Sequence, residues 1–176
     1  GVLFGANRAG LSGGAIHAEA GSSVSAQDSS FQANQASHGG AIAANGSLAL
    51  TDVSIQNNTV SGEGGGIQAY FNATSLLRTT LEGNRARHGG GLLQRGRTLS
   101  LIDSSIVSNF ATQFADGDGG GLRIVTNEYG GDLVMVALAE PDLGSKKLNV
   151  TLMGRDAVGQ FALKRSYRFQ VNDFAY

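Results

Sequence analysis

Apolar and polar positions recur along this chain with a period of 24 to 27 residues. In each period an apolar anchor is followed three positions later by asparagine; the five pairs are Phe4/Asn7, Phe31/Asn34, Ile55/Asn58, Leu81/Asn84 and Ile106/Asn109. A glycine cluster follows each pair and closes on an apolar residue, at Ile16, Ile42, Ile67, Leu92 and Leu122. Self-similarity at this period is typical of solenoids, in which each repeat stacks on its neighbours.

The pattern inside each period distinguishes strands from helices. Val24 and Ala26 precede the anchor Phe31, and similar alternating pairs precede Ile55 and Ile106. Alternation with period two indicates strands, and these stretches do not keep the i, i+3, i+4, i+7 spacing of a helix. The sequence therefore predicts an all-β fold, a right-handed parallel β-helix of about five coils that lie ~4.8 Å apart.

Stacked coils would place equivalent residues in columns. The anchors would form one interior ladder and the apolar residues after the glycines a second. The asparagines would form an amide ladder at a tight bend, each side chain donating to one neighbouring coil and accepting from the other. Asparagine also tolerates the left-handed backbone that such a bend often needs. Glycine is expected where φ is positive or where a side chain would meet the next coil.

Two repeats carry a full motif, F-x-x-N followed by G-G-A-I, at residues 4–7 with 13–16 and at residues 31–34 with 39–42. This motif resembles the repeat signature of the chlamydial polymorphic outer membrane proteins and of related β-helix repeats in large microbial surface proteins. The resemblance covers residues 1–126, although later repeats have Ile or Leu as the anchor and Gly in place of Ala. The resemblance implies a surface-exposed adhesin or structural segment, and these motifs do not imply an enzymatic activity.

The repeat ends near residue 126, and residues 127–176 alternate strongly, as at 133–138 and 148–152. One interpretation is a β-rich cap on the solenoid of residues 1–126. The other is the start of an Ig-like β module, since this stretch is short beside the ~100 residues of a complete sandwich.

Composition excludes several functions. The net charge of −1 gives no electrostatic reason to expect nucleic acid or an anionic membrane as a partner. The chain has no cysteine and therefore no disulfide or thiolate chemistry. We find no apolar run of 18 residues and no signal peptide. Because residue 1 falls in mid-repeat, we expect this chain to be a segment of a longer protein.

Stacking would align His38, Glu63 and His88 in one column, which makes them a candidate metal or acid–base site. The simpler interpretation is favourable contact between imidazole and carboxylate groups at exposed corners. A second column would hold Arg78 between aspartates, with a structural role; it consists of Asp28, Asp52, Arg78 and Asp103.

Two further groups of charged residues suggest ligands. Asp116 and Asp118 beside Arg123 come nearest to the carboxylate–arginine groove of pectate lyases and polygalacturonases. Such an Asp-Gly-Asp-Gly-Gly loop is more often a plain turn, or at most half a calcium site. Arginines gather near the fourth coil, where they could recognise an acidic glycan or an acidic neighbouring subunit, or form a solvated face. They are Arg85, Arg87, Arg95 and Arg97.

We interpret the chain as a non-catalytic structural or adhesive segment of a large extracellular surface or filamentous appendage protein, with no catalytic residue, cofactor or metal. Its expected partners are neighbouring domains of the same longer chain or other copies of it, and surface glycans. The alternative, a polysaccharide-binding or depolymerising β-helix, needs acids and aromatics along a groove, and Tyr70–Phe71 is the only adjacent aromatic pair in the coils. Four N-x-[ST] sequons are candidate N-glycosylation sites in a eukaryotic host; they lie at Asn45, Asn57, Asn72 and Asn149.

Overall fold

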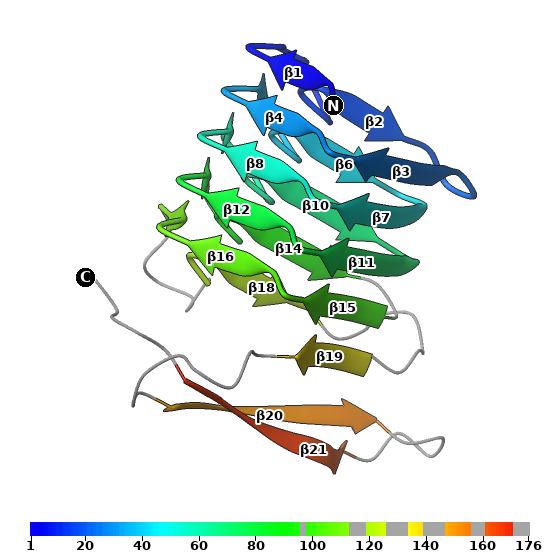
Figure 1. Cartoon of the computed structure of the whole chain (residues 1–176), viewed down its shortest axis with the longest axis vertical. Helices are drawn as coiled ribbons and strands as arrows, with labels where there is room; N and C mark the ends of the chain where they lie inside the picture. The colour runs from blue at the N-terminus through cyan, green and yellow to red at the C-terminus, as the bar shows by residue number, and fades with distance from the viewer. Residues whose placement is uncertain (96–97, 113–118, 126–133, 139–146, 156–160, 171–176) are drawn as a thin grey trace.

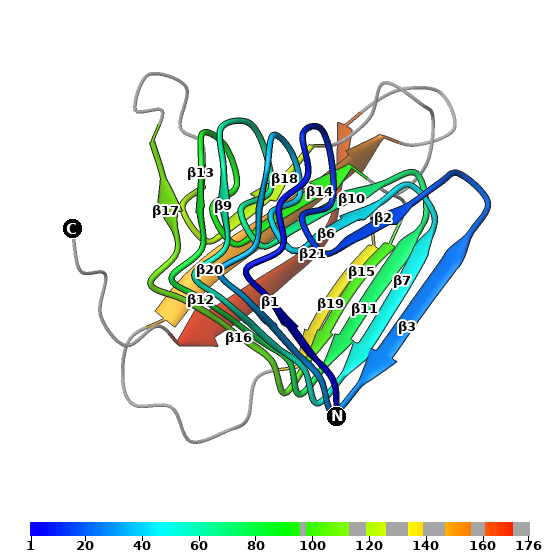
Figure 2. The same ribbon diagram turned by 90° about the horizontal axis from the view of Figure 1, so that it is seen from above.

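The chain winds into a parallel β-solenoid whose coils lie one below another (Figure 1). The structure is a computed structural model that describes residues 1–95, 98–112, 119–125, 134–138, 147–155 and 161–170. Every regular element in these ranges is a strand, and none is a helix. Seen from the N-terminal end, the chain runs clockwise as it moves away from the viewer, so the solenoid is right-handed (Figure 2). The predicted fold class is confirmed.

Three five-stranded parallel sheets form the walls. The first sheet contains the anchors and consists of β1 (Leu3–Gly5), β4 (Ser30–Gln32), β8 (Ser54–Gln56), β12 (Thr80–Glu82) and β16 (Ser105–Val107). The second consists of β2 (Ile16–Ala18), β6 (Ile42–Ala44), β10 (Ile67–Tyr70), β14 (Leu92–Arg95) and β18 (Leu122–Ile124). The third consists of β3 (Ser23–Gln27), β7 (Ser47–Thr51), β11 (Ala73–Leu77), β15 (Thr98–Ile102) and β19 (Val134–Leu138).

A fourth, narrower sheet follows the asparagine bends. It consists of β5 (Gln35–Ala36), β9 (Thr59–Val60), β13 (Arg85–Ala86) and β17 (Phe110–Ala111). The five strands of the first sheet are joined by four complete turns of the chain, so the solenoid has about four turns where the sequence predicted about five coils.

The core is a set of vertical apolar ladders, as the repeat predicts. In the first sheet Phe4 pairs with Phe31, and their rings stack with centroids 4.6 Å apart. In the second sheet the residues after the glycines stack in register, from Ile16 through Ile42 to Leu122. The inner members are fully buried, and each such side chain contributes roughly 1.5–3 kcal/mol of transfer free energy.

Beyond residue 126 the structure describes three strands. β19 pairs parallel with β15, so the third sheet extends by one strand past the end of the repeat. β20 (Lys147–Arg155) and β21 (Phe161–Gln170) pair with each other as an antiparallel ribbon. Whether residues 127–176 are a cap or a separate module stays a prediction. In the described ranges, no helix long and apolar enough to cross a membrane occurs.

Candidate functional site

The five repeat asparagines form a continuous amide ladder inside the bend between the first and fourth sheets. The backbone N–H of each of the first four asparagines donates to the Oδ1 of its equivalent in the next coil, at 2.8–3.0 Å. The side-chain Nδ2 donates to the same oxygen at 2.9 Å. From the second coil on, Nδ2 also donates to the anchor carbonyl of the preceding coil, at 2.8–3.0 Å.

This geometry saturates the interior amides. Asn34, Asn58 and Asn84 have no exposed surface, and both hydrogens and both lone pairs of each side-chain amide are used. A buried amide is costly unless it is paired, so the ladder permits a sharp bend inside the core.

The left-handed backbone at this bend lies one residue before the asparagine, which corrects the expectation drawn from the sequence. Positive φ angles of 52–61° occur at Ala6, Ala33, Asn57, Gly83 and Ser108. The asparagines themselves are not among the described residues with positive φ. The role of the ladder asparagines is therefore to hydrogen-bond one another. The residue before each of them, whose type varies from coil to coil, adopts the unfavourable left-handed conformation.

In the glycine clusters, one glycine adopts a positive φ and the next one allows close approach of the neighbouring coil. The first glycine has positive φ, as at Gly39 (57°) and Gly64 (69°). The second has an ordinary φ but no space, because a Cβ on Gly40 would meet the carbonyl oxygen of Gly65, and a Cβ on Gly65 would meet that of Gly90. The paired glycines thus let the chain turn and let successive coils approach closely.

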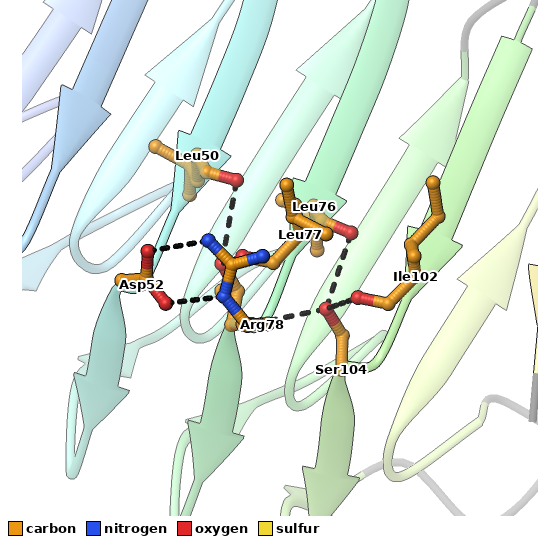
Figure 3. A network of polar contacts seen from close by, with 8 residues as sticks. Leu50, Asp52, Leu76, Leu77, Arg78, Ile102 and Ser104 are labelled. Atoms are coloured by element: carbon orange, nitrogen blue, oxygen red, sulfur yellow. Dashed lines mark hydrogen bonds and ion pairs between the residues drawn. The ribbon is translucent and has the colours of Figure 1, made fainter. Parts of the chain in front are cut away.

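A polar corner joins the third sheet to the first, and the sequence predicted only part of it. The charged column of Asp28, Asp52, Arg78 and Asp103 occupies this corner, and all four residues have positive φ of 46–56°. Arg78 binds Asp52 through two hydrogen bonds, from Nε to Oδ1 at 2.6 Å and from Nη2 to Oδ2 at 2.7 Å (Figure 3). This hydrogen bonding is the main cause that holds the pKa of Asp52 below its usual value; burial opposes it, and the charge of Arg78 adds a lesser lowering.

A column of hydroxyl groups lies directly behind these charges. Ser29, Thr79 and Ser104 each donate to the carbonyl two residues earlier, at 2.7–3.1 Å. Ser104 also accepts the backbone N–H of Thr79 from the preceding coil at 3.0 Å. The signal in the sequence was a hydroxyl residue after each charged corner residue, a pattern interrupted only by Val53.

A shallow groove follows this corner at the N-terminal end of the solenoid. Its polar lining includes the charged groups of Asp28, Asp52 and Arg78 and hydroxyls such as Ser54 and Thr80. No aromatic side chain is among the described residues that line it. The described lining therefore offers acids and hydroxyls to a hydrogen-bonding ligand, without an aromatic ring.

Backbone register brings together the candidate metal column of His38, Glu63 and His88, whose role as a metal site stays a prediction. Glu63 pairs with His88, and its N–H lies 3.4 Å from the Nδ1 of His38. The Glu63 carboxylate instead binds Arg95 Nη2 at 2.7 Å and the Tyr70 hydroxyl at 3.1 Å. In the described part of the chain, no three His, Cys, Asp or Glu side chains are placed to hold a metal ion. The register of the coils determines the backbone neighbours of Glu63, whereas its carboxylate is hydrogen-bonded to the Arg95 guanidinium and the Tyr70 hydroxyl.

Tyr70 is the centre of this second polar cluster. Its hydroxyl donates to Glu63 and accepts from Gln68 Nε2 at 3.0 Å, while the Arg95 guanidinium lies 5.3 Å from the ring centroid. Burial, followed by the nearby Glu63 charge, raises the pKa of Tyr70 to about 12. The hydroxyl therefore stays protonated at neutral pH. The sequence predicted neither the cluster nor the direction of these side chains.

Two of the four arginines, Arg85 and Arg95, lie on different sheets. Arg85 lies over the Phe110 ring at 5.2 Å on the fourth sheet, and Arg95 belongs to the Tyr70 cluster on the second. Arg87 follows β13. Arg97, Asp116 and Asp118 lie outside the described residues, so the predicted lyase-like group with Arg123 has no structural test.

The candidate glycosylation sites differ in their surroundings. Asn57 is exposed, whereas Asn45 and Asn72 are half-buried and joined by a 3.5 Å contact from Asn72 Nδ2 to the Asn45 carbonyl. Asn149 lies on β20. Glycosylation at these positions stays a prediction.

Fold and bend together define the class: a parallel β-solenoid whose repeat combines an interior amide ladder with paired corner glycines. Residues 52–70 match the model of the Chlamydia polymorphic membrane protein (Chlamydia_PMP) repeat. This one matched repeat and the parallel solenoid together fit a β-helix repeat of the polymorphic membrane protein type, and the likeness broadly supports a cell-surface location. No curated protein and no solved structure matches the chain significantly.

Proposed function

We propose that this segment is a non-catalytic structural and adhesive element of a large extracellular surface or filamentous appendage protein. The observation that carries the proposal is the unbroken amide ladder from Asn7 to Asn109, parallel to the apolar ladders. This continuous ladder couples each coil to the next and makes the solenoid a stiff rod. A stiff rod suits a protein that projects from a surface or displays binding groups along its length.

The state of the acidic side chains supports a role without catalysis. A lyase or hydrolase needs carboxylates that reach the substrate with a pKa suited to proton transfer. Asp52 is held by Arg78 with a lowered pKa, and Glu63 is held by Arg95 and Tyr70. These carboxylates contribute to the surface of the rod through ion pairs.

The partners we propose are neighbouring domains of the same longer chain or other copies of it, together with surface glycans. Strand edges at the end of a solenoid can pair with further strands, which allows filament formation. Nucleic acid and direct membrane insertion by this segment are not part of the proposal, because the net charge of −1 offers no attraction to polyanions.

The test is a turnover assay on the purified chain. Incubation with polygalacturonate should release neither reducing ends nor unsaturated products above the level of a heat-denatured sample. The double variant Asp52→Asn with Arg78→Ala is the matched control, because it removes the main charges of the groove. Product release that depends on the folded chain and disappears in this variant would establish the depolymerising alternative instead.

A further inference from the structure

The turn between β10 and β11 presents a strained, exposed aromatic residue. Phe71 has a φ of 69° and 46% of its surface exposed. This backbone conformation is costly for a bulky side chain and is normally taken by glycine. The turn before β3 uses Gly21, with φ 81°, two residues before the strand, which is the place that Phe71 takes before β11. The third coil therefore keeps a phenylalanine where glycine would be easier.

A fixed polar platform supports this ring. The Phe71 and Tyr70 rings lie with centroids 5.6 Å apart, and Arg95 covers Tyr70. Arg95, in turn, is held by Glu63, which also accepts the Tyr70 hydroxyl. Because strain persists only where the surroundings enforce it, and often at binding sites, the turn indicates a binding function.

The composition of this surface favours a sugar over a protein. A protein interface needs several apolar side chains in a buried centre. Among the described residues, the other exposed large apolar side chains belong to other elements; they are Val2, Leu3, Leu11, Val107 and Phe110. A single exposed ring beside Tyr70, which itself contacts guanidinium, carboxylate and amide groups, matches the apolar face and hydroxyls of one sugar unit.

The charges at this turn favour an acidic sugar. Arg95 and Arg123 both act on Tyr70 electrostatically, against the single carboxylate of Glu63. The local balance of these three groups is positive. Guanidinium groups bind carboxylates strongly. A carboxylated sugar therefore gains binding affinity from these arginines that a neutral sugar does not.

We propose that Phe71, Tyr70 and Arg95 form a contact site for a carboxylated glycan, with the sugar ring against Phe71 and its carboxylate near the arginine. The site rests on the proposed adhesive function and specifies its ligand class. Phe71 acts as the apolar contact, and the Tyr70 cluster fixes its position.

The decisive variant is Phe71→Gly, because it removes the ring and suits the backbone. The purified chain is titrated with oligogalacturonate and with the same oligosaccharide after reduction of its carboxyl groups. We expect binding to the first probe only, about tenfold weaker binding by Phe71→Gly, and a melting temperature equal to or above that of the parent. Phe110→Ala is the matched control, since Phe110 is also 46% exposed, and it should bind like the parent.

Three results would overturn the site: no binding by the parent chain, unchanged affinity in Phe71→Gly, or a clear loss of melting temperature in that variant, which would make Phe71 structural. If Phe71→Gly loses adhesion equally to cells with and without their glycans, the surface binds a protein instead. If the chain neither binds oligogalacturonate nor degrades polysaccharide, the glycan site is wrong but the structural role stands. If the chain degrades polysaccharide, the proposed non-catalytic function is wrong.

Discussion

Replacing Gly65 by alanine is expected to lower the free energy of unfolding by about 3 kcal/mol or more, because overpacking a rigid site costs this much. The added Cβ would meet the Gly90 carbonyl oxygen and lie 2.8 Å from the backbone nitrogen of Arg85. Backbone atoms cannot rotate away as a side chain does. Relief would require the coils to separate and would strain bonds such as Gly65 N to Gly89 O at 3.1 Å.

Gly10→Ala is the control for this effect. A Cβ at Gly10 meets no atom within 4 Å, and its φ is not in the left-handed region. We expect a change within about 0.5 kcal/mol, measured by urea denaturation of both variants. Equal midpoints for the two variants would show that the coils are not packed as closely as the structure places them.

Replacing Asn58 by alanine is expected to cost about 4 kcal/mol, since several buried polar groups lose their partners at about 1–3 kcal/mol each. The N–H and Nδ2 groups of Asn34 lose their common acceptor. The Phe31 carbonyl and the Asn84 Oδ1 each lose a donor. No exposed surface at Asn34, Asn58 or Asn84 allows water to replace them directly.

Asn7→Ala provides the matched comparison within the same column. Asn7 is exposed and donates to Asn34 at the end of the ladder. Its loss should cost no more than about 1 kcal/mol, measured by the same denaturation. A loss at Asn7 as large as at Asn58 would mean that the ladder contributes no more in the core than at its end.

The sequence was sufficient for the columns because a repeat states which residues are equivalent. Once Phe31 is equivalent to Phe4 and Ile55, parallel pairing places them in one ladder, and the register confirms it. Equivalence within the repeat also placed Asn58 between Asn34 and Asn84, where each amide can donate to one neighbour and accept from the other.

Side-chain direction and local backbone were not predictable in this way. The left-handed residue of the bend varies between alanine, asparagine, glycine and serine, so the sequence carries no constant signal for it. Glu63 was placed beside the histidines correctly by register, but its carboxylate binds Arg95, which lies 32 residues away. The Arg95 guanidinium reaches Glu63 only when the second sheet has folded. The exposure of the Phe71 ring was likewise visible only in the structure.

Native-state amide hydrogen exchange tests the central claim, that the coils form one rod held together by the amide ladder. The backbone N–H groups of Asn34, Asn58 and Asn84 each donate to the next asparagine side chain. We expect all three to be among the slowest to exchange, with a common opening free energy equal to that of global unfolding. Exchange at these three positions as fast as at an exposed turn, or with unrelated opening free energies, would contradict it.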